Sequence, residues 1–423
     1  MEEKKLLDAY RRVGTDMTSL KESLEDIDSI TKTFEARGRD LMLLSVCNIP
    51  EYQQEGFTPC YILTKEYVDE FMEGKALHVF KIPNEKIGQE VLAEVKKNTG
   101  LIALFENRVY SVSAYALPLL LQRAEVAGHF PIRENGIIRD LMAASGLFAC
   151  NERMTVVYRE DEGIRKIFAF MGGKYIPVKQ RSLLEVLNSL KREGICGEYR
   201  LSNYLVDHEY TDIEVSFPEM AEEYSTLVGK DVIPGVILST SDIGSSSVRI
   251  RGIYRIGGHR VLTEEVGLRH TKGLSEEKIL KEVDDKIFKD FRKLPETLVK
   301  LIGISVAPEA DLTTEKGKRE NEKTIGDAYE ALLKTLYPTS CTGIGHKKRT
   351  ELLEAIKSEI NPEVRYTAYD IAANLMGLPE RIDGLGRDTL EKMEKAGSQA
   401  PYATEKYFTT KPEPDKEITL LSA

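Results

Sequence analysis

The sequence predicts an α+β protein with a largely antiparallel central sheet, flanking helices and a helical C-terminal region. Between residues 153 and 268, short strand-like segments follow the order strand, strand, helix and then several strands, without the regular strand–helix alternation of a parallel sheet. Beyond about residue 310, apolar residues recur at helical spacing instead. With 423 residues, the chain is long enough for two or three domains and a substantial core.

We divide the chain into five regions by these changes of pattern. They are a charged helical N-terminal segment at 1–45, a mixed α/β region at 46–150, an α+β core with the antiparallel sheet at 151–310, a helical C-terminal region at 311–397, and a flexible polar tail at 398–423.

The N-terminal half is expected to begin with helix. Apolar residues recur at helical spacing within the first 40 residues, at Leu6, Leu7, Tyr10, Val13 and Met17. In the mixed region we expect strands over 76–82 and 101–112 and helices over 85–97, 113–127 and 135–144.

The core is expected to begin with a hairpin. Strands over 154–158 and 165–171 flank an acidic turn at 160–163, and an amphipathic helix follows over 182–192. Further strands are expected over 199–206, 212–216, 232–239, 248–256 and 260–268, before a long helix over 275–291. The C-terminal helices are expected over 320–336, 346–357, 368–376 and 387–396.

Composition indicates a soluble cytoplasmic protein. The net charge is -10, with 41% hydrophobic and 30% charged residues, and the longest apolar run, near 114–121, is too short to cross a membrane. The N-terminus lacks the pattern of a secretion signal. The five cysteines lie far apart without a Cys-x-x-Cys pair, so we expect reduced thiols, no disulfide framework and no zinc site.

The strand expected over 248–256 concentrates positive charge in this acidic protein. Its apolar residues fall on one parity, at Val248, Ile250, Tyr254 and Ile256, and its arginines fall on the other, at Arg249, Arg251 and Arg255. Because successive side chains of a strand point to opposite faces, one face is expected to join the core and the other to be basic. Three more basic residues follow, at Arg260, Arg269 and Lys272.

Two interpretations of this basic face remain open. A concentrated positive face can follow a phosphate backbone. It can equally be a solvated outer face whose arginines pair with some of the 69 acidic residues. The nucleic-acid interpretation requires the guanidinium groups to be open to solvent and without compensating carboxylates.

Two further segments near this strand can contribute to a site. The hydroxyl- and glycine-rich turn at 240–247, with Ser241, Ser245 and Ser246, can present backbone N–H groups to an anion, or its hydroxyls can satisfy neighbouring backbone groups. His270, which follows Arg269, can contact phosphate. No acidic partner stands at a fixed spacing from it, so we expect a positioning role and neither a general base nor a metal ligand.

Two C-terminal segments place a Gly-apolar-Gly turn directly before a helix. They read TGIGHKKRTELL at 342–353 and DGLGRDTLEKM at 383–393, and they resemble helix-hairpin-helix elements of DNA-binding proteins. Such a turn leaves free N–H groups and a favourable dipole for a phosphate, although glycine before a helix is also an ordinary cap. Lys347, Lys348 and Arg349 add charge to the first copy.

The order of the central motifs resembles a family of uncharacterised proteins found on prophages and conjugative plasmids. The segments are KIFAFMGGKYIPVKQRSLLEVLNSL, IPGVILSTSDIGSSSVRIRGIYRIGGHRV, GLRHTKG and, near the C-terminus, TAYDIAANLMGLPERIDGLGRDTLEKMEKAG. The resemblance covers roughly residues 150–400. The chain departs from the family at Thr240 and Asp242, where the family has Asn and Glu, and at 257–259, where Gly-Gly-His replaces Cys-x-Asn-Gly. The resemblance implies a mobile-element context and no particular chemistry.

Together these patterns predict a non-enzymatic nucleic-acid-binding protein of a phage or plasmid, with no catalytic residue, metal or cofactor. We found no His-Glu-x-x-His, Gly-x-Ser-x-Gly, Walker A or Gly-x-Gly-x-x-Gly signature in a suitable context. Single-stranded DNA is the favoured partner, bound or annealed through its phosphates, and self-association is a further expectation. The alternative is a protein-interaction module, either an inhibitor of a host defence system or a virion-associated subunit. The acidic net charge would suit mimicry of DNA.

Overall fold

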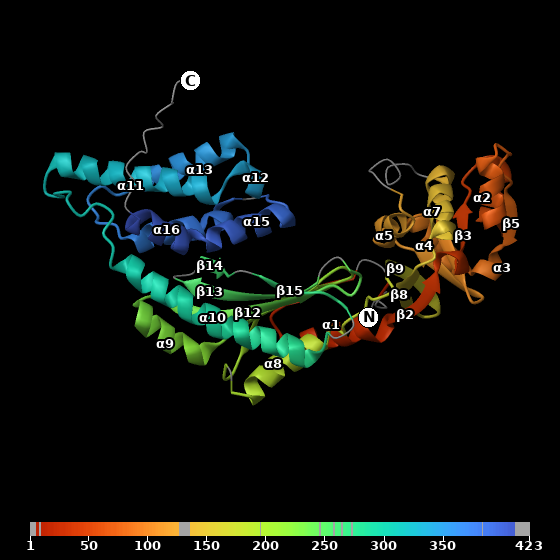
Figure 1. Cartoon of the computed structure of the whole chain (residues 1–423), viewed down its shortest axis with the longest axis horizontal. Helices are drawn as coiled ribbons and strands as arrows, with labels where there is room; N and C mark the ends of the chain where they lie inside the picture. Colours follow the sequence, from red (N-terminus) through yellow and green to blue (C-terminus); the bar gives the residue numbers. More distant parts are fainter. Residues whose placement is uncertain are drawn as a thin grey trace, which may run out of the picture.

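The protein is built around two separate sheets that are joined by a buried polar contact (Figure 1). The structure, a computed structural model, describes residues 6–7, 10–126, 136–194, 196–244, 247–256, 259–263, 265–271, 274–382 and 384–410. The mixture of antiparallel sheets and flanking helices confirms the predicted α+β class.

Sheet A is antiparallel throughout and has the strand order β1-β10-β11-β12-β13-β14, with β15 also paired to β13. Its strands are β1 (Arg11–Gly14), β10 (Arg200–Asp207), β11 (Thr211–Ser216), β12 (Val232–Thr240), β13 (Val248–Ile256), β14 (His259–Leu262) and β15 (Val266–Leu268). The helices of this lobe are α1 (Met17–Ile30), α8 (Ser182–Arg192), α9 (Pro218–Val228) and α10 (Glu276–Ile302). The apolar face of sheet A forms one continuous core with these helices, because Val236, Ile250 and Tyr254 pack with Leu187 and Val283.

Sheet B has the order β2-β8-β9-β7-β6-β3-β4-β5 and is antiparallel except for the pair β7–β9. Its strands are β2 (Thr31–Arg37), β3 (Met42–Val46), β4 (Phe57–Leu63), β5 (Phe80–Pro83), β6 (Leu101–Phe105), β7 (Arg108–Val112), β8 (Arg153–Asp161) and β9 (Ile164–Gly172). Its helices are α2 (Lys65–Met72), α3 (Asn84–Ile87), α4 (Gln89–Lys97), α5 (Ala116–Arg123) and α7 (Ile137–Ala149). Alternation of apolar residues along β3 sends Leu43 into one core and Leu44 into another, so both faces of this sheet are covered.

The C-terminal region is helical, as predicted. Its helices are α11 (Glu315–Leu336), α12 (Thr339–Thr342), α13 (His346–Ser358), α14 (Ala368–Met376), α15 (Arg387–Ser398) and α16 (Ala400–Thr409). They lie above sheet A, on the side opposite to α8 and α9 (Figure 1). The contacts of α14 and α15 with β14 and of α16 with α10 attach this region to the sheet.

Three of the predicted boundaries are wrong. The first 45 residues are not a helical segment: Asp16 caps α1 by accepting from the Ser19 N–H at 2.7 Å, and the preceding Arg11–Gly14 forms an edge strand of sheet A. The boundary near residue 150 cuts through sheet B, because the predicted hairpin β8–β9 pairs with β2 and β7. The tail is ordered as far as α16, whose Ala400 and Thr404 are fully buried.

Other elements differ from expectation in their ends. The predicted strand 101–112 is a hairpin, β6–β7, whose turn residues Glu106 and Asn107 both have positive φ. The predicted strand 260–268 is two short strands, β14 and β15, which pair with different parts of β13. No helix in the described ranges has both the length and the apolar composition that crossing a bilayer requires. The predicted tail from residue 411 onward lies outside the described residues.

Candidate nucleic-acid interface

The alternation predicted for β13 is confirmed. Val248, Ile250, Tyr254 and Ile256 are buried in the core of sheet A. The three arginines point to the opposite face, which carries a small apolar cluster of Ile237, Ile253 and Leu262. The alternation of apolar and basic residues therefore predicted correctly which side chains of β13 point to the core and which point to the opposite face.

The arginines of this face are compensated by carboxylates, contrary to the requirement for an open basic face. Arg249 lies 3.8 Å from Glu265, and Arg251 makes a short two-nitrogen contact with the same carboxylate. Arg255 donates to Glu214 Oε1 at 2.5 Å, and Arg260 donates to Glu214 Oε2 at 2.8 Å. Glu214 stands on β11, two strands away from β13, so the pairing depends on sheet topology and has no signature in the local sequence.

A helix also covers part of this face. Glu394 of α15 accepts from Arg260 Nη1 at 2.8 Å, and α15 packs against β14. Burial raises the pKa of Glu394, and the neighbouring Arg260 opposes that shift. A cavity of about 430 Å³ remains between the sheet and α15, lined by Arg11, Arg249, Arg251 and Arg260 together with Asp212, Glu214 and Glu394. This cavity carries nearly balanced charge, and it is not a basic groove.

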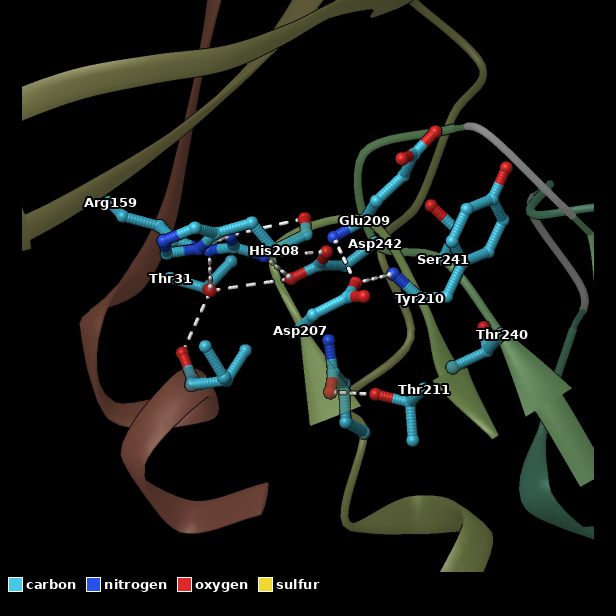
Figure 2. Close-up of polar contacts among 12 residues, drawn as sticks. Thr31, Arg159, Asp207, His208, Glu209, Tyr210, Thr211, Thr240, Ser241 and Asp242 are labelled. Atoms are coloured by element: carbon cyan, nitrogen blue, oxygen red, sulfur yellow. Dashed lines mark hydrogen bonds and ion pairs between the residues drawn. The ribbon is translucent and has the colours of Figure 1, made fainter. Parts of the chain in front are cut away.

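The predicted anion-binding turn is partly buried in the contact between the two sheets (Figure 2). Ser241 is fully buried, and its carbonyl lies 3.3 Å from the Tyr175 hydroxyl, which donates to the Asp242 carbonyl at 2.8 Å. The expectation that Ser241 offers donors to an outside anion is therefore wrong. Ser245 and Ser246 lie outside the described residues.

Asp242 holds the two sheets together through Arg159 of β8. Arg159 Nη2 donates to both Asp242 oxygens, at 2.9 and 3.2 Å, and Arg159 is fully buried. Its Nη1 lies 2.5 Å from His208 Nδ1 and its Nε 3.3 Å from Thr31 Oγ1. Because a guanidinium only donates, His208 Nδ1 must be the acceptor and the ring proton must sit on Nε2. The ring of Phe168 lies 4.4 Å below the guanidinium.

His270 sits beside this contact in a shallow cavity. Its Nε2 lies 3.2 Å from Thr240 Oγ1, and Tyr175 stacks on its ring at 5.3 Å. Burial lowers the pKa of His270, so the ring is neutral near pH 7. The cavity, of about 260 Å³, is also lined by the exposed side chains of Arg269 and Lys174, which brings together segments far apart in the sequence. Lys272 lies outside the described residues.

The two glycine turns of the C-terminal region have the same backbone conformation. Gly343 and Gly384 both have φ 75°, a value that glycine adopts without strain. Gly345 and Gly386 are the N-caps of α13 and α15, with φ/ψ of -65°/158° and -63°/153°. The apolar residue between the glycines, Ile344 in the first turn, is buried and anchors the turn. The sequence similarity of the two segments therefore reflects a structural repeat.

Both turns are open to solvent. A Cβ added at Gly343, Gly345, Gly384 or Gly386 would meet no atom within 4 Å. The N-cap residues of α13 and α15 are glycines and provide no side-chain cap, and within the described residues no other acceptor takes the first-turn N–H groups. Helix α12, which leads into the first turn, packs against α15, the helix that begins at the second turn.

Two of the three predicted basic residues of the first turn are exposed. Lys347 and Lys348 project into solvent, and Arg349 is half-buried. Lys348 lies 3.6 Å from Glu351, an exposed pair on the same helix. Within the described part of the chain, Lys347 and Arg349 make no ion pair. The first turn therefore combines free N–H groups with uncompensated positive charge.

Five residues that no sequence motif identified neutralise the arginines of β13 and β14 or fix Asp242. Glu214, Glu265 and Glu394 neutralise the arginines, and Arg159 and His208 hold Asp242 in place. Each comes from a strand, loop or helix whose spatial position the local pattern does not encode. Among the described residues, no group of three or more His, Cys, Asp or Glu side chains is arranged to hold a metal ion.

No protein-family profile, curated protein or solved structure matches this chain.

Proposed function

We propose that this protein binds nucleic acid through the phosphate backbone, at the two Gly-apolar-Gly turns of its C-terminal region, and carries out no chemistry there. Following the sequence resemblance, the nucleic acid would be the DNA of a phage or plasmid. The proposal keeps the predicted function and moves its site from β13 to α13 and α15.

The observation that carries the proposal is the repeated turn. The positive φ at positions 343 and 384 explains why these residues are glycines. Gly345 and Gly386 differ, because their backbone angles suit any residue and the space where a side chain would stand is empty. The fold does not need glycine at these two positions. A ligand that approaches the backbone closely does need it, as phosphate does at glycine-rich helix starts.

Charge and geometry support the same site. The N-termini of α13 and α15 each provide free N–H groups and the positive end of a helix dipole. Lys347 and Arg349 add charge that no carboxylate of the described residues neutralises. Two such turns joined through α12 and α15 can contact two phosphates of one nucleic acid, and contacts of this kind fix position without reading sequence.

The arginine face supports the proposal much less. Arg249, Arg251, Arg255 and Arg260 are already engaged by three glutamates. A phosphate would have to displace those carboxylates and the covering helix α15, whereas nothing has to move at Gly345.

Fluorescence anisotropy with labelled single-stranded and double-stranded oligonucleotides over a range of salt concentrations tests the proposal. We expect the logarithm of the binding constant to fall linearly with the logarithm of the salt concentration. Replacing Lys347, Lys348 and Arg349 with glutamate should reduce that slope by about 2–3 on duplex DNA. The matched control replaces Lys316, Arg319 and Lys323, exposed on α11, with glutamate and should leave most of the slope.

A second variant tests the turn itself. Gly345→Ala suits the backbone of this residue but places a methyl group where the phosphate would lie, and we expect about tenfold weaker binding through a lost charge-assisted hydrogen bond. Gly303→Ala is the control, since Gly303 is also exposed and has an ordinary φ of -74°. The absence of salt-dependent binding to either oligonucleotide would refute the proposal. A stoichiometric protein partner purified with no nucleic acid would then favour the interaction module.

A further inference from the structure

A cavity in the lobe of sheet B lies away from both glycine turns. It has a volume of about 860 Å³, within the range of small-molecule sites. It lies at the C-terminal end of β3 and beside Tyr61 of β4, between the C-terminal end of α4 and the N-terminal end of α7. The residues that line it include the apolar Ile49, Pro50 and Ile137 and the polar Lys96, Asn98 and Arg139.

A buried ion pair forms one wall of this cavity. Arg139 and Asp140 are 4% and 1% exposed, and Arg139 Nε donates to Asp140 Oδ1 at 2.7 Å. The other carboxylate oxygen accepts from Ser45 Oγ at 2.5 Å. Arg139 Nη2 donates to the Thr99 carbonyl at 2.9 Å and also contacts Asp140. Both oxygens of Asp140 are therefore occupied, and the pair is rigidly placed.

One nitrogen of the buried Arg139 guanidinium has no hydrogen-bond partner among the described residues. Nε and Nη2 make the contacts just described, and within the described residues nothing engages Nη1 of Arg139. Burying a guanidinium is costly, and its donors are normally satisfied. A donor left open in the wall of a cavity is suited to an acceptor that comes from outside.

Other groups around the cavity favour a negative charge at this point. Helix α7 has 13 residues and begins at the cavity, with Gly136 as an N-cap that provides no side-chain acceptor. Its first-turn N–H groups and dipole favour an anion. Lys96 adds an exposed ammonium group at the rim. Ile49, 42% exposed, offers an apolar contact for the rest of a ligand.

From this arrangement we infer that the cavity binds a small organic anion. Its carboxylate or phosphate group lies against Arg139 and the N-terminus of α7, with Lys96 beside it. Its apolar body lies on Ile49, Pro50 and Ile137. This site is independent of the nucleic-acid proposal, because it uses none of the residues of the glycine turns.

Isothermal titration of the full-length protein with benzoate and with phenyl phosphate tests the inference. Benzamide, which has the shape of benzoate without its charge, is the neutral control. We expect saturable binding of at least one anion, with a dissociation constant of about 1 mM or lower, and no saturable binding of benzamide. Binding of neither anion, or equal binding of benzamide, would overturn the inference.

Variants locate the site. Lys96→Gln should weaken anion binding about two- to fivefold, the effect of losing one exposed charge contact, whereas Lys97→Gln should leave it unchanged because Lys97 does not line the cavity. The double variant Arg139→Gln with Asp140→Asn removes both buried charges together and should weaken binding by about tenfold or more. If the double variant does not fold, the comparison of Lys96 with Lys97 still decides: equal affinities for the two variants would contradict the site.

Discussion

The buried contact between Arg159 and Asp242 should be essential for stability, and Asp242→Asn tests this. The substitution keeps the shape of the side chain and removes its charge. Water cannot replace the lost partner of Arg159, because the Arg159 side chain has 0% accessible surface and the Asp242 side chain has 3%. Leaving one partner of a buried ion pair uncompensated costs about 3–5 kcal/mol. A loss of this size is a large part of the stability of an ordinary domain, about 5–15 kcal/mol.

The assay is urea denaturation followed by circular dichroism, with Glu35→Gln as the control. Glu35 of β2 pairs with Arg153, which stands on β8 as Arg159 does, but at 3.5 Å with side chains 63% and 68% exposed. An exposed pair of this kind contributes less than about 1 kcal/mol. Of the two substitutions, only Asp242→Asn should therefore lower the free energy of unfolding by several kcal/mol.

A double variant separates charge from packing. Arg159→Met combined with Asp242→Asn removes both charges, so we expect part of the lost free energy of unfolding to return. The reasoning fails if Asp242→Asn destabilises no more than Glu35→Gln does. It also fails if the effects of the two single substitutions simply add.

Three further predictions concern the turns and the buried polar groups. Gly343→Ala should cost about 1–2 kcal/mol in urea denaturation, because alanine is strained at φ 75°. Tyr175→Phe should cost about 1 kcal/mol in the same assay, because it removes the hydrogen bond to the Asp242 carbonyl. For Glu394, burial raises the pKa in the folded state above the ordinary value of 4.5, which the unfolded state keeps. Between the unfolded-state pKa and the folded-state pKa, the folded state therefore binds more protons than the unfolded state. The free energy of unfolding, measured relative to Glu394→Gln, should therefore fall as the pH rises through this window.

Each of these three has a result that would contradict it. A Gly343→Ala protein as stable as Gly345→Ala would show that the positive φ imposes no strain. Tyr175→Phe should lower the free energy of unfolding more than Tyr52→Phe does, because Tyr52 is 42% exposed; equal effects would exclude a contribution of the hydrogen bond. If the stability difference between the wild type and Glu394→Gln rises with pH, the assigned direction of the pKa shift is wrong.

The sequence predicted those parts of the fold that local patterns encode. Alternation along β13 identified Val248 and Tyr254 as core residues, because strand geometry fixes the facing of neighbouring side chains. The glycine turns could also be predicted, because Gly343 and Gly345 determine the backbone only of the few residues around them. The predicted hairpin β8–β9 is confirmed, and its acidic turn reverses the chain through positive φ at Glu162 and Gly163.

The interactions that the sequence did not predict are separated by long stretches of chain. Arg255 meets Glu214 across 41 residues, and Arg260 meets Glu394 across 134. No local pattern distinguishes a basic face that stays open from one that a distant glutamate neutralises. The N-terminal strand β1 was missed because its residues are mostly exposed and carry little hydrophobic pattern, while Asp16 was not recognised as the cap of α1.

The most direct test of the proposed function is hydrogen–deuterium exchange with and without a short DNA duplex. Binding at the glycine turns should slow exchange of the backbone amides at 343–349 and 384–390, where the free N–H groups of α13 and α15 would donate to phosphates. Unchanged exchange at both turns, with protection confined to the arginines of 249–260, would contradict the account.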